Sequence, residues 1–567
     1  MTQDAADVAA IGEDTFDLWA SFQPGTAALA GRISAQIGLP RAQDAARVAD
    51  DARAVKSRLE KVDPKALSRR DELTRRYLDF ELGKLIEQSK LHDFAFEITP
   101  YQIAGSTSGA HQVLATASLS TARDRENFEE LVRQYAEYFV RLDVALREQA
   151  ARGVVAPASA IPGCLATLRG LAAALENILL PSAARLSSLD PSTANAFVAR
   201  LIRIVENDAR PAIQRSIDYI GGDYARRAPD RVGLAQYRGG LDAYTMLIRH
   251  HTTESLTPEA LHAKGIALVS EIESEMARIR DHLGVNMSGP DFLERLAADD
   301  RFYCKSAEET GALFRGLLKK CEAVFPKAFG MRKFPTYAVE RLAAMEEEGM
   351  TFGYYQPPSF NGAQLGAYKF NGSKLNERMT IGAASLIYHE ILPGHHLHIG
   401  TEMCDASRPN VRRFPTITAF NEGWAEYAAD LGWELGLYDN PYDQYGRLLL
   451  RSFLASRLVV DTGLNAFGWP LDRARAYMRE HSAMSATEIA SEILRYSTSI
   501  PGQALGYALG RQHFWDFRRK AEAQLGSAFD LPDFHSAILE GGSLPIGDLA
   551  FSLDNWVAEH KASGAGT

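Results

Sequence analysis

Apolar residues recur at intervals of three and four along most of the chain, which predicts a mainly α-helical protein. The clearest case is 124–152, where the apolar positions form one stripe and Gly153 follows as a residue suited to end a helix. Thr257 is expected to cap another helix, because a proline stands at its first position. Ser306 opens a capping box for a third helix, which should end near Pro326. The first two thirds of the chain therefore favours a helical bundle.

The periodicity changes between residues 334 and 380. Segments 351–356 (TFGYYQ) and 365–370 (LGAYKF) are rich in aromatic residues, and the segment between them is typical of a turn. We expect a small antiparallel sheet here. Its exposed edge could hold an extended peptide through main-chain hydrogen bonds, with Tyr368 as a substrate contact, while a purely structural hairpin fits the pattern equally well.

Composition narrows the class of protein. The 567 residues are 46% hydrophobic and 24% charged, as in ordinary globular proteins. A formal net charge of -10, with no stripe of lysine and arginine, argues against nucleic acid as a partner. The most apolar stretch, 154–184, is interrupted by prolines and by Arg169 and Glu176, so we expect no membrane span. The four cysteines are scattered and form no C-x-x-C pair, which fits a reducing compartment.

The N-terminal segment 1–7 is acidic and lacks the basic and apolar regions of a secretory signal. A cytoplasmic location is therefore expected, with an exported protein whose signal has been removed as the alternative. No flexible linker is evident. We divide the chain into an N-terminal helical half, 1–250, and a catalytic half, 251–567, which together form one continuous catalytic unit.

Candidate chemistry is concentrated in residues 388–398 (YHEILPGHHLH), which hold four of the fourteen histidines. In the common His-Glu-x-x-His motif, histidines at positions i and i+4 of one helix bind one zinc ion. Here Pro393 stands at i+4 from His389. On an uninterrupted helix His395 would lie about 120° away from the His389 face, and His396 about 10 Å further along it. Neither could then share an ion with His389.

Pro393 and Gly394 could interrupt the helix between the histidines, because proline removes a backbone donor and glycine permits unusual backbone angles. A two-residue bulge at this point would bring His395 into the place of the second ligand. His396 would then contact the substrate or an oxyanion, or serve as the alternative ligand. Glu390 would take a proton from water activated by the metal and later pass it to the leaving amine. A hydrogen-bonded surface helix without metal is the structural alternative.

A third ligand is expected from residues 421–427 (NEGWAEY). Glu422 is followed by Glu426 and Asp430 at i+4 and i+8, so the three acids share one helical face. We expect Glu422 to bind the metal and Glu426 to orient a ligand histidine. A solvated acidic stripe is the alternative, which the apolar neighbour Trp424 disfavours. Together these residues predict a site for one Zn²⁺ ion.

These motifs resemble the bacterial family called domain of unknown function 885, whose signature is His-Glu-x-x-Pro-Gly-His-His followed by Glu-Gly-Trp-Ala-x-Tyr. The resemblance extends over most of the chain, including segments 252–259, 366–371 and 496–504. That family is similar in turn to helical gluzincin peptidases such as thimet oligopeptidase, angiotensin-converting enzyme and the thermostable carboxypeptidases. The resemblance implies a large helical body with a deep cleft. It also supports His395 as a ligand, because segment 394–398 is similar to the end of the zinc helix in thimet-type enzymes.

The resemblance further implies that a tyrosine from a late helix stabilises the oxyanion. Tyr507 and Tyr496 are the candidates. Gln503, Tyr507 and Arg511 fall at i, i+4 and i+8 after Pro501, so Gln503 and Arg511 are candidates for substrate binding, with Arg511 directed at a carboxylate. A polar stripe packed against the cleft wall is the alternative.

The first expectation for function is a zinc-dependent peptidase or amide hydrolase that acts on short peptides. The second is a metal-dependent lyase or amidohydrolase acting on a non-peptide metabolite at the same site. The third is a catalytically silent protein that binds peptides. Glu390 weighs against the third, because a binding protein has no use for a general base beside the ligands.

Overall fold

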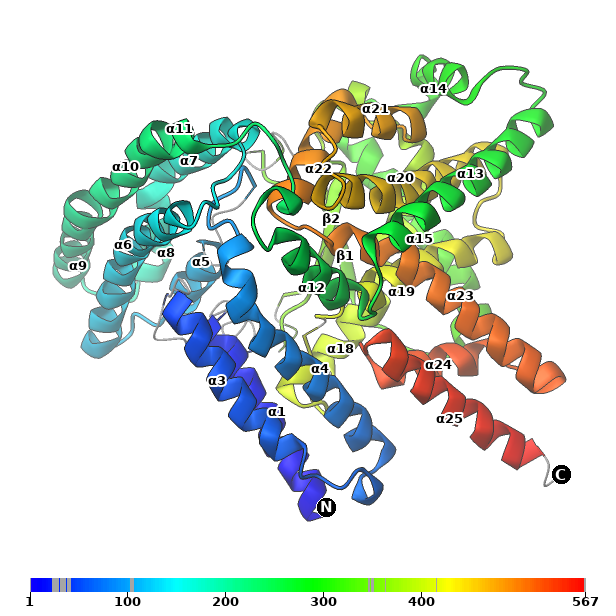
Figure 1. The fold of residues 1–567 in the computed structure, drawn as a ribbon, viewed down its shortest axis with the longest axis horizontal. Coiled ribbons are helices and arrows are strands. Elements are labelled where there is room, and N and C mark those ends of the chain that lie inside the picture. Colours follow the sequence, from blue (N-terminus) through cyan, green and yellow to red (C-terminus); the bar gives the residue numbers. More distant parts are fainter. Residues whose placement is uncertain are drawn as a thin grey trace.

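The computed structural model describes residues 2–22, 30, 37, 42–101, 107–344, 347, 351–360, 362, 364–414 and 416–564. Helices dominate this part of the chain, as predicted (Figure 1). The helices that begin the chain are α1 (Gln3–Phe22), α3 (Ala42–Leu59) and α4 (Arg69–Leu91). A bundle follows, made of α5 (Thr107–Thr116), α6 (Ala122–Ala151), α7 (Ile161–Leu179), α8 (Ala183–Leu186), α9 (Pro191–Ile204), α10 (Arg210–Tyr219) and α11 (Ala225–Arg227).

The remaining helices form the larger body of the molecule. They are α12 (Gly240–Thr252), α13 (Pro258–His282), α14 (Gly289–Ala297), α15 (Ala307–Val324), α16 (Pro326–Phe329), α17 (Ala383–Glu390), α18 (Thr401–Cys404), α19 (Thr418–Glu434), α20 (Pro441–Asn465), α21 (Leu471–His481), α22 (Ala486–Thr498), α23 (Gly506–Leu525), α24 (Leu531–Gly541) and α25 (Ile546–Gly564). Short irregular helices connect some of them, among them η10 (His396–Gly400), η11 (Asn410–Arg412) and η12 (Gln503–Leu505).

The predicted helix starts and stops are confirmed. Gly153 follows the end of α6 with a φ of 84°, a conformation that favours glycine. The Thr257 side chain accepts from the backbone N–H of Ala260 at the start of α13. Ser306 caps α15 in the same way through the N–H of Glu309. The Glu309 carboxylate, however, accepts from the N–H of Lys305 rather than from Ser306, so only half of the expected capping box forms.

The sheet has three strands, β1 (Tyr337–Arg341), β2 (Gly353–Gln356) and β3 (Gly366–Phe370), in the order β1-β3-β2. Strands β2 and β3 are the expected antiparallel pair, with Tyr355 opposite Tyr368. Strand β1, which was not predicted, pairs parallel to β3, so the sheet is mixed where a small antiparallel sheet was expected. The reason is that β1 lies outside the aromatic hairpin and joins β3 through a long connection, which local periodicity does not reveal.

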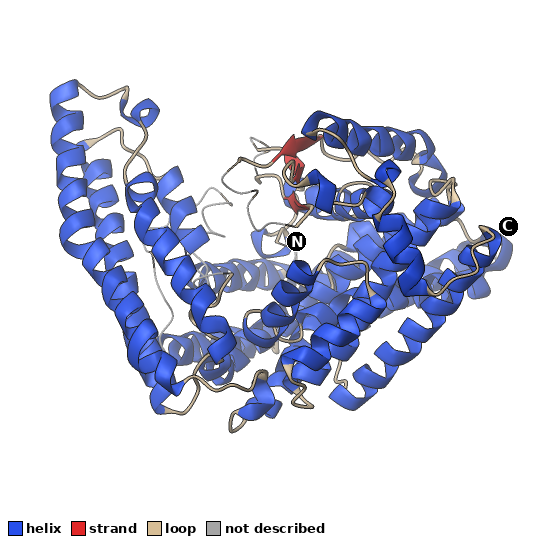
Figure 2. Ribbon diagram, turned by 90° about the horizontal axis from the view of Figure 1, so that it is seen from above, coloured by secondary structure: helices blue, strands red, loops and turns tan. Residues whose placement is uncertain are grey.

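There are two large hydrophobic cores, and one of them crosses the boundary at residue 250. One belongs to the bundle and buries residues of α6 to α10 such as Phe139 and Leu201. The other joins the first helices to the C-terminal part, since Leu78 of α4 shares it with Phe420 of α19 and Leu553 of α25. Figure 2 shows the bundle standing apart from the larger body, with the strands on the side of that body that faces it.

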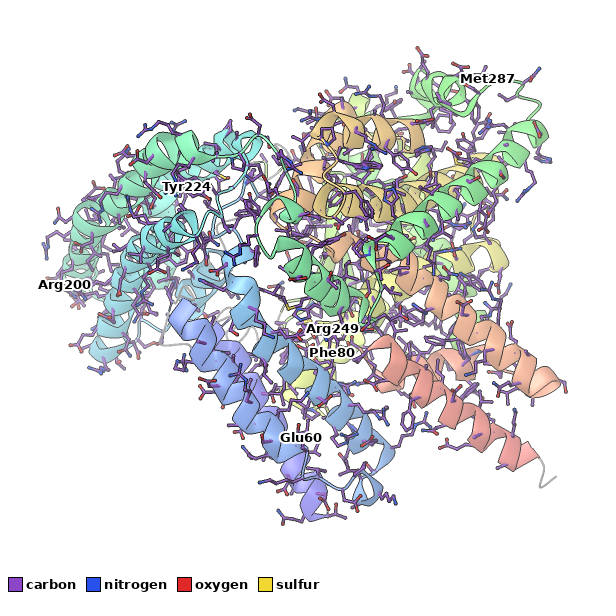
Figure 3. The ribbon with its side chains drawn as sticks, in the orientation of Figure 1. Glu60, Phe80, Arg200, Tyr224, Arg249 and Met287 are labelled. Carbon is purple, nitrogen blue, oxygen red and sulfur yellow. The ribbon has the colours of Figure 1, made fainter. Side chains whose placement is uncertain are left out.

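Contacts between α4 and α12 link the first helices to the larger body. The Glu87 carboxylate lies 2.7 Å from Nε2 of His250 and also pairs with Arg249. Figure 3 places Arg249 and Phe80 at this junction.

By length and composition alone, the stretch Ala158–Leu186 could cross a membrane, and its mean hydropathy is 1.4. It contains α7, whose residues Ile161, Leu168 and Leu175 pack into the core of the bundle.

Candidate metal centre

The helix that carries the histidine segment is interrupted between His389 and His395, where their spacing predicted a break. Helix α17 ends at Glu390, Ile391 leaves helical geometry with φ -114° and ψ -84°, and helical conformation resumes at His395. The N–H of Leu397 donates to the carbonyl of Ile391 at 3.3 Å, six residues back instead of the usual four. The predicted two-residue bulge is therefore confirmed.

Helix α19 holds this break in place. The indole N–H of the fully buried Trp424 donates to the carbonyl of Pro393 at 3.1 Å. Gly423, one residue earlier, lets α19 approach α23, because a Cβ atom there would meet the backbone of Gly510 at 2.5 Å. The motif that supplies Glu422 thus also fixes the histidine segment and the late helix that carries Tyr507.

His389, His395 and Glu422 come together as predicted, and one possible ligand atom from each lies within 4.8 Å of the others. Oε2 of Glu422 is 3.2 Å from Nε2 of His395 and 3.5 Å from Nε2 of His389. Both histidines are buried. The same carboxylate oxygen is buried without a hydrogen bond from the described chain, so the donor set fits a cation such as zinc.

Glu426 occupies the position expected for a carboxylate that orients a ligand. Its Oε1 lies 2.7 Å from Nδ1 of His389, the ring nitrogen that faces away from Glu422. Its other oxygen lies 2.8 Å from the fully buried guanidinium of Arg447, which in turn lies 2.7 Å from Asp430. Arg511 pairs with the other oxygen of Asp430. Arg511 therefore belongs to a network of ion pairs behind Glu426, where its guanidinium is paired with Asp430.

Electrostatics bind these groups tightly together. Burial disfavours a charged His389, but its close contacts with the carboxylates of Glu422 and Glu426 outweigh burial and raise the pKa of His389 to about 10. Burial also opposes ionisation of Glu426, yet the Arg447 charge and His389 lower its pKa to about 2. The pKa of Glu422 is likewise lowered, against burial, by His395 and His389. Protons and a metal ion would therefore compete for the same side chains.

Glu390 lies beside the cluster on the last turn of α17. Its Oε2 accepts from the backbone N–H of Tyr355 on strand β2 at 3.1 Å. Burial raises the pKa of Glu390, and the charges of His389 and His395 oppose that rise. The carboxylate is thus close enough to both histidines for their charges to act on it.

His396 points away from the cluster. Its Nδ1 lies 3.1 Å from the hydroxyl of Tyr355 and its Nε2 lies 2.6 Å from the carbonyl of Pro335, so both ring nitrogens are engaged. The fully buried ring connects the resumed helix to the sheet. Of the two roles expected for His396, neither the alternative ligand nor the oxyanion contact fits this placement. Tyr368 is also fully buried, packed against Phe314 at a centroid distance of 4.8 Å, so its side chain is covered by the protein rather than open to a substrate.

The two candidate tyrosines differ in their surroundings. The ring of Tyr507 stacks beside His389 at 6.4 Å with an interplanar angle of 8°, and the tyrosine is half-buried. Gln503 hydrogen-bonds to it, so this predicted pair lies together at the cluster. Tyr496 is fully buried, and its hydroxyl is engaged by Arg457 at 2.7 Å and by Glu492. Tyr507 is therefore the tyrosine placed to reach a reacting group.

Three residues at the site were not found from the sequence. Arg457 lies over the ring of Tyr507 at 4.6 Å, Arg447 balances Glu426, and Tyr355 faces His395 at a ring distance of 6.1 Å. Arg447 and Arg457 both lie on the buried helix α20. An arginine among the apolar residues of a buried helix is unusual, and this was the sequence signal that could have identified them. Tyr355 lay in a predicted strand that precedes the motif. The sequence did not indicate that the folded chain would bring its backbone N–H to Glu390.

Solved structures share this fold. A crystal structure described as "the putative lipoprotein from Colwellia psychrerythraea" superposes with a TM-score of 0.87, at 22% identity, over 99% of this chain and 100% of that chain. A second, described as "a putative lipoprotein of unknown function from Shewanella oneidensis", gives a TM-score of 0.73 at 16% identity over 96% of this chain and 98% of that chain. These likenesses show the fold, and they lend no support to the expected cytoplasmic location.

No curated protein matches this sequence. The relation to gluzincin peptidases and the deep cleft that it implies stay predictions. The family model for "Bacterial protein of unknown function (DUF885)" matches residues 24–552, which include the histidine segment, the Glu422 motif and the late helix. The chain therefore belongs to the DUF885 family, as its signature motifs indicated.

Proposed function

We propose that this protein is a zinc-dependent hydrolase that cleaves short peptides or small amides. One observation carries the proposal: His389, His395 and Glu422 converge from both sides of the helix break and from α19, while Glu390 stands beside them. Two histidines and a carboxylate form the protein part of known catalytic zinc sites. A purely structural cluster would not need a further carboxylate next to the ligands.

Each residue then has a chemical role. A bound zinc ion supplies Lewis-acid chemistry, polarising a carbonyl and lowering the pKa of water. Glu390 takes the proton from the attacking water and delivers it to the leaving nitrogen. Tyr507, beside His389, donates a hydrogen bond to the oxygen that gains negative charge. Glu426 holds the His389 ring in position through Nδ1.

The sheet supports a peptide as the substrate. Strand β2 is an edge strand, and the N–H of Tyr355 points from it toward Glu390. An extended peptide lying along this edge would hydrogen-bond to the main chain and bring a scissile amide to the cluster.

The test combines metal analysis with an activity screen. The purified protein is expected to contain about one zinc per chain, since the three ligands define one site. It is also expected to hydrolyse short peptides. Glu390→Gln should keep the metal and lose roughly 100- to 10,000-fold in activity, the usual contribution of a general base. Glu377→Gln, an exposed glutamate outside the cluster, is the matched control and should retain full activity.

Other results would point elsewhere. Metal without peptide hydrolysis, but with turnover of a non-peptide amide or an elimination substrate, would favour the second candidate function. Peptide binding without turnover would favour a silent binding protein. An active Glu390→Gln enzyme would remove that residue from the role of base.

An exported location is proposed as well, because the two structural neighbours are described as lipoproteins. Fractionation of the source bacterium, with immunodetection of the protein in each fraction, tests it. Recovery in the cytoplasmic fraction would contradict it.

A further inference from the structure

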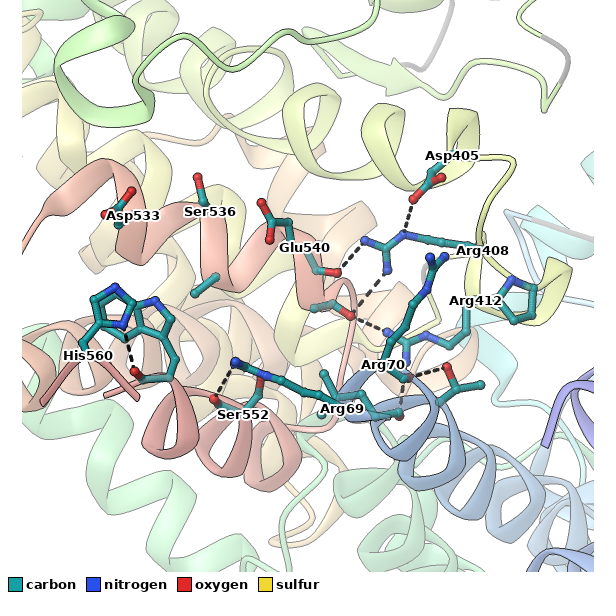
Figure 4. A pocket seen from close by; sticks show the side chains of 16 residues that line it. Arg69, Arg70, Asp405, Arg408, Arg412, Asp533, Ser536, Glu540, Ser552 and His560 are labelled. Atoms are coloured by element: carbon teal, nitrogen blue, oxygen red, sulfur yellow. Dashed lines mark hydrogen bonds and ion pairs between the residues drawn. The ribbon is translucent and has the colours of Figure 1, made fainter. Parts of the chain in front are cut away.

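A pocket with a volume of about 680 Å³ lies apart from the metal cluster. Figure 4 shows it between α4, the segment that follows α18, and helices α24 and α25. None of the metal-cluster residues lines it. Its basic lining residues are Arg69, Arg70, Arg408, Arg412 and His560.

Three guanidinium groups gather at one end of this pocket, those of Arg70, Arg408 and Arg412 (Figure 4). Arg412 is buried, with 3% of its surface exposed, and its Nε is buried without a hydrogen-bond partner among the described residues. Its terminal nitrogens donate to the carbonyls of Leu73 and Gly541, and the guanidinium lies over the Tyr77 ring at 4.7 Å. A buried cation with no carboxylate in contact and one N–H left over is an incomplete environment.

Arg70 is similarly free to bind. It is exposed, and one of its terminal nitrogens donates to the carbonyl and the hydroxyl of Ser407. Within the part of the chain that the structure describes, neither Arg70 nor Arg412 has a carboxylate oxygen within 4.0 Å. Burial lowers the pKa of Arg412 to about 10, and the charges of Arg408 and Arg70 add to the effect while Glu402 opposes it.

The nearby carboxylates do not balance this group. Asp405 pairs with Arg408 at 3.1 Å, and the charge of Arg70 also acts on this carboxylate. Glu402 acts on Arg408 and Arg412, but its oxygens are already engaged by His398 and Ser543. Three cations thus face two carboxylates.

The other charged residues that line the pocket form ion pairs of their own or lie at its far end. Arg69 is neutralised by Glu559 at 2.9 Å, and Glu540 pairs with Arg332 at 3.3 Å. Figure 4 shows Asp533 at the opposite end of the pocket from the three guanidiniums. The unbalanced positive charge is therefore local to the end formed by Arg70, Arg408 and Arg412.

We infer that this pocket binds the phosphate group of a small phosphate ester, with Arg70 and Arg412 as its main contacts. Phosphate carries close to two negative charges and three strong acceptor oxygens, which suit several guanidinium groups better than a single carboxylate does. The volume leaves room for an organic part that extends toward Ser536, Ser552 and His560. This ligand is distinct from the substrate proposed for the metal centre.

Calorimetric titration of the full chain tests the inference. Inorganic phosphate and glycerol phosphate are titrated at fixed ionic strength, with acetate as a monoanion control. We expect saturable binding of one phosphate per chain and no comparable binding of acetate. Arg70→Gln should weaken phosphate binding by about 10-fold or more, since it removes charged hydrogen bonds. Arg203→Gln, an exposed arginine of α9 outside the pocket, removes the same charge and should bind as the wild type does.

The source of the phosphate is distinguished by a vesicle arm. Binding of glycerol phosphate identifies a soluble ester, whereas Arg70-dependent binding confined to vesicles containing phosphatidylglycerol identifies a lipid headgroup. Because Arg70 is exposed, its variant should melt at the wild-type temperature, and the more buried Arg412→Lys provides a second test. Absence of saturable binding, or equal affinity in wild type and Arg70→Gln, overturns the inference. Neither result bears on hydrolysis at the metal centre.

Discussion

His395 and His396 are adjacent in sequence but have opposite surroundings. His395 faces Glu422, whereas both nitrogens of His396 are engaged by Tyr355 and the Pro335 carbonyl. The difference arises because one residue of helix turns the side chain by about 100°. A proposed ligand and a structural residue are thus neighbours in the sequence.

This contrast predicts different effects for the same substitution. His395→Gln should lower zinc affinity by more than about 100-fold, which exceeds the usual loss from changing an outer partner of a ligand. His396→Gln should keep the zinc and lower the free energy of unfolding by about 1 kcal/mol, because its buried hydrogen bonds are disturbed. Competition with a fluorescent chelator and urea titration measure the two quantities. Equal loss of zinc in both variants would contradict this assignment.

Glu97, which lies between α4 and α5 and outside the candidate metal centre, provides a pH-dependent prediction. Burial raises its pKa to about 8. Between pH 4.5 and 8 the unfolded chain loses this proton while the folded protein keeps it. The free energy of unfolding is therefore highest below pH 4.5, and it falls as the pH rises toward 8.

Glu97→Gln should remove this part of the pH dependence. Relative to the variant, the wild type should lose at most about 5 kcal/mol of unfolding free energy across this range. Urea titrations of both proteins at pH 5 and pH 8 provide the comparison. Parallel pH profiles would show that Glu97 titrates normally in the folded protein.

At the scale of elements, the break between α17 and η10 determines whether a metal site exists. Its formation depends on Gly394, where a Cβ atom would overlap the carbonyl of His389. It depends equally on α19, whose Trp424 donates to Pro393. The break is therefore a packed structure rather than a loose loop.

Gly394→Ala should consequently disrupt the centre. We expect it to lower the free energy of unfolding by about 3 kcal/mol, the upper range for overpacking, and to reduce zinc binding because His395 is displaced. Gly382→Ala is the matched control at the start of the same helix, since a Cβ atom there meets no other atom within 4 Å. Thermal unfolding and zinc titration test the pair, and a Gly394→Ala protein with wild-type behaviour in both would refute the steric argument.

The sequence was informative about this element for a physical reason. Helix geometry is regular enough that the misfit of Pro393 could be recognised, and a bulge was the simplest way to bring His389 and His395 together. The helix caps at Thr257 and Ser306 were similarly local. In contrast, the parallel pairing of β1 and the engagement of Arg511 by Asp430 depend on contacts between distant segments, which local patterns do not contain.

At the scale of the whole molecule, the metal cluster joins elements that are otherwise connected by side-chain packing. His389 and His395 flank the break and Glu422 comes from α19. An ion bound to all three would favour the folded state, because the unfolded chain cannot hold them together.

Zinc should therefore raise the melting temperature of the wild type. At a free zinc concentration 100 times the dissociation constant, the stabilisation should be about 2.7 kcal/mol. Glu422→Gln should show little response to zinc at the same concentration. Differential scanning calorimetry with and without a chelator measures both, and an identical zinc response in the two proteins would argue against Glu422 as a ligand.

The division into two cores has a consequence for how the chain folds as it is synthesised. Residues of α6 to α10 share a core formed within one continuous stretch, so this bundle can fold while the ribosome is still translating the rest. Helices α1, α3 and α4 pack on one another, but they share their core with residues as late as Leu553, so this core is completed only when synthesis is nearly finished. The beginning of the chain is therefore among the last parts to reach its native packing.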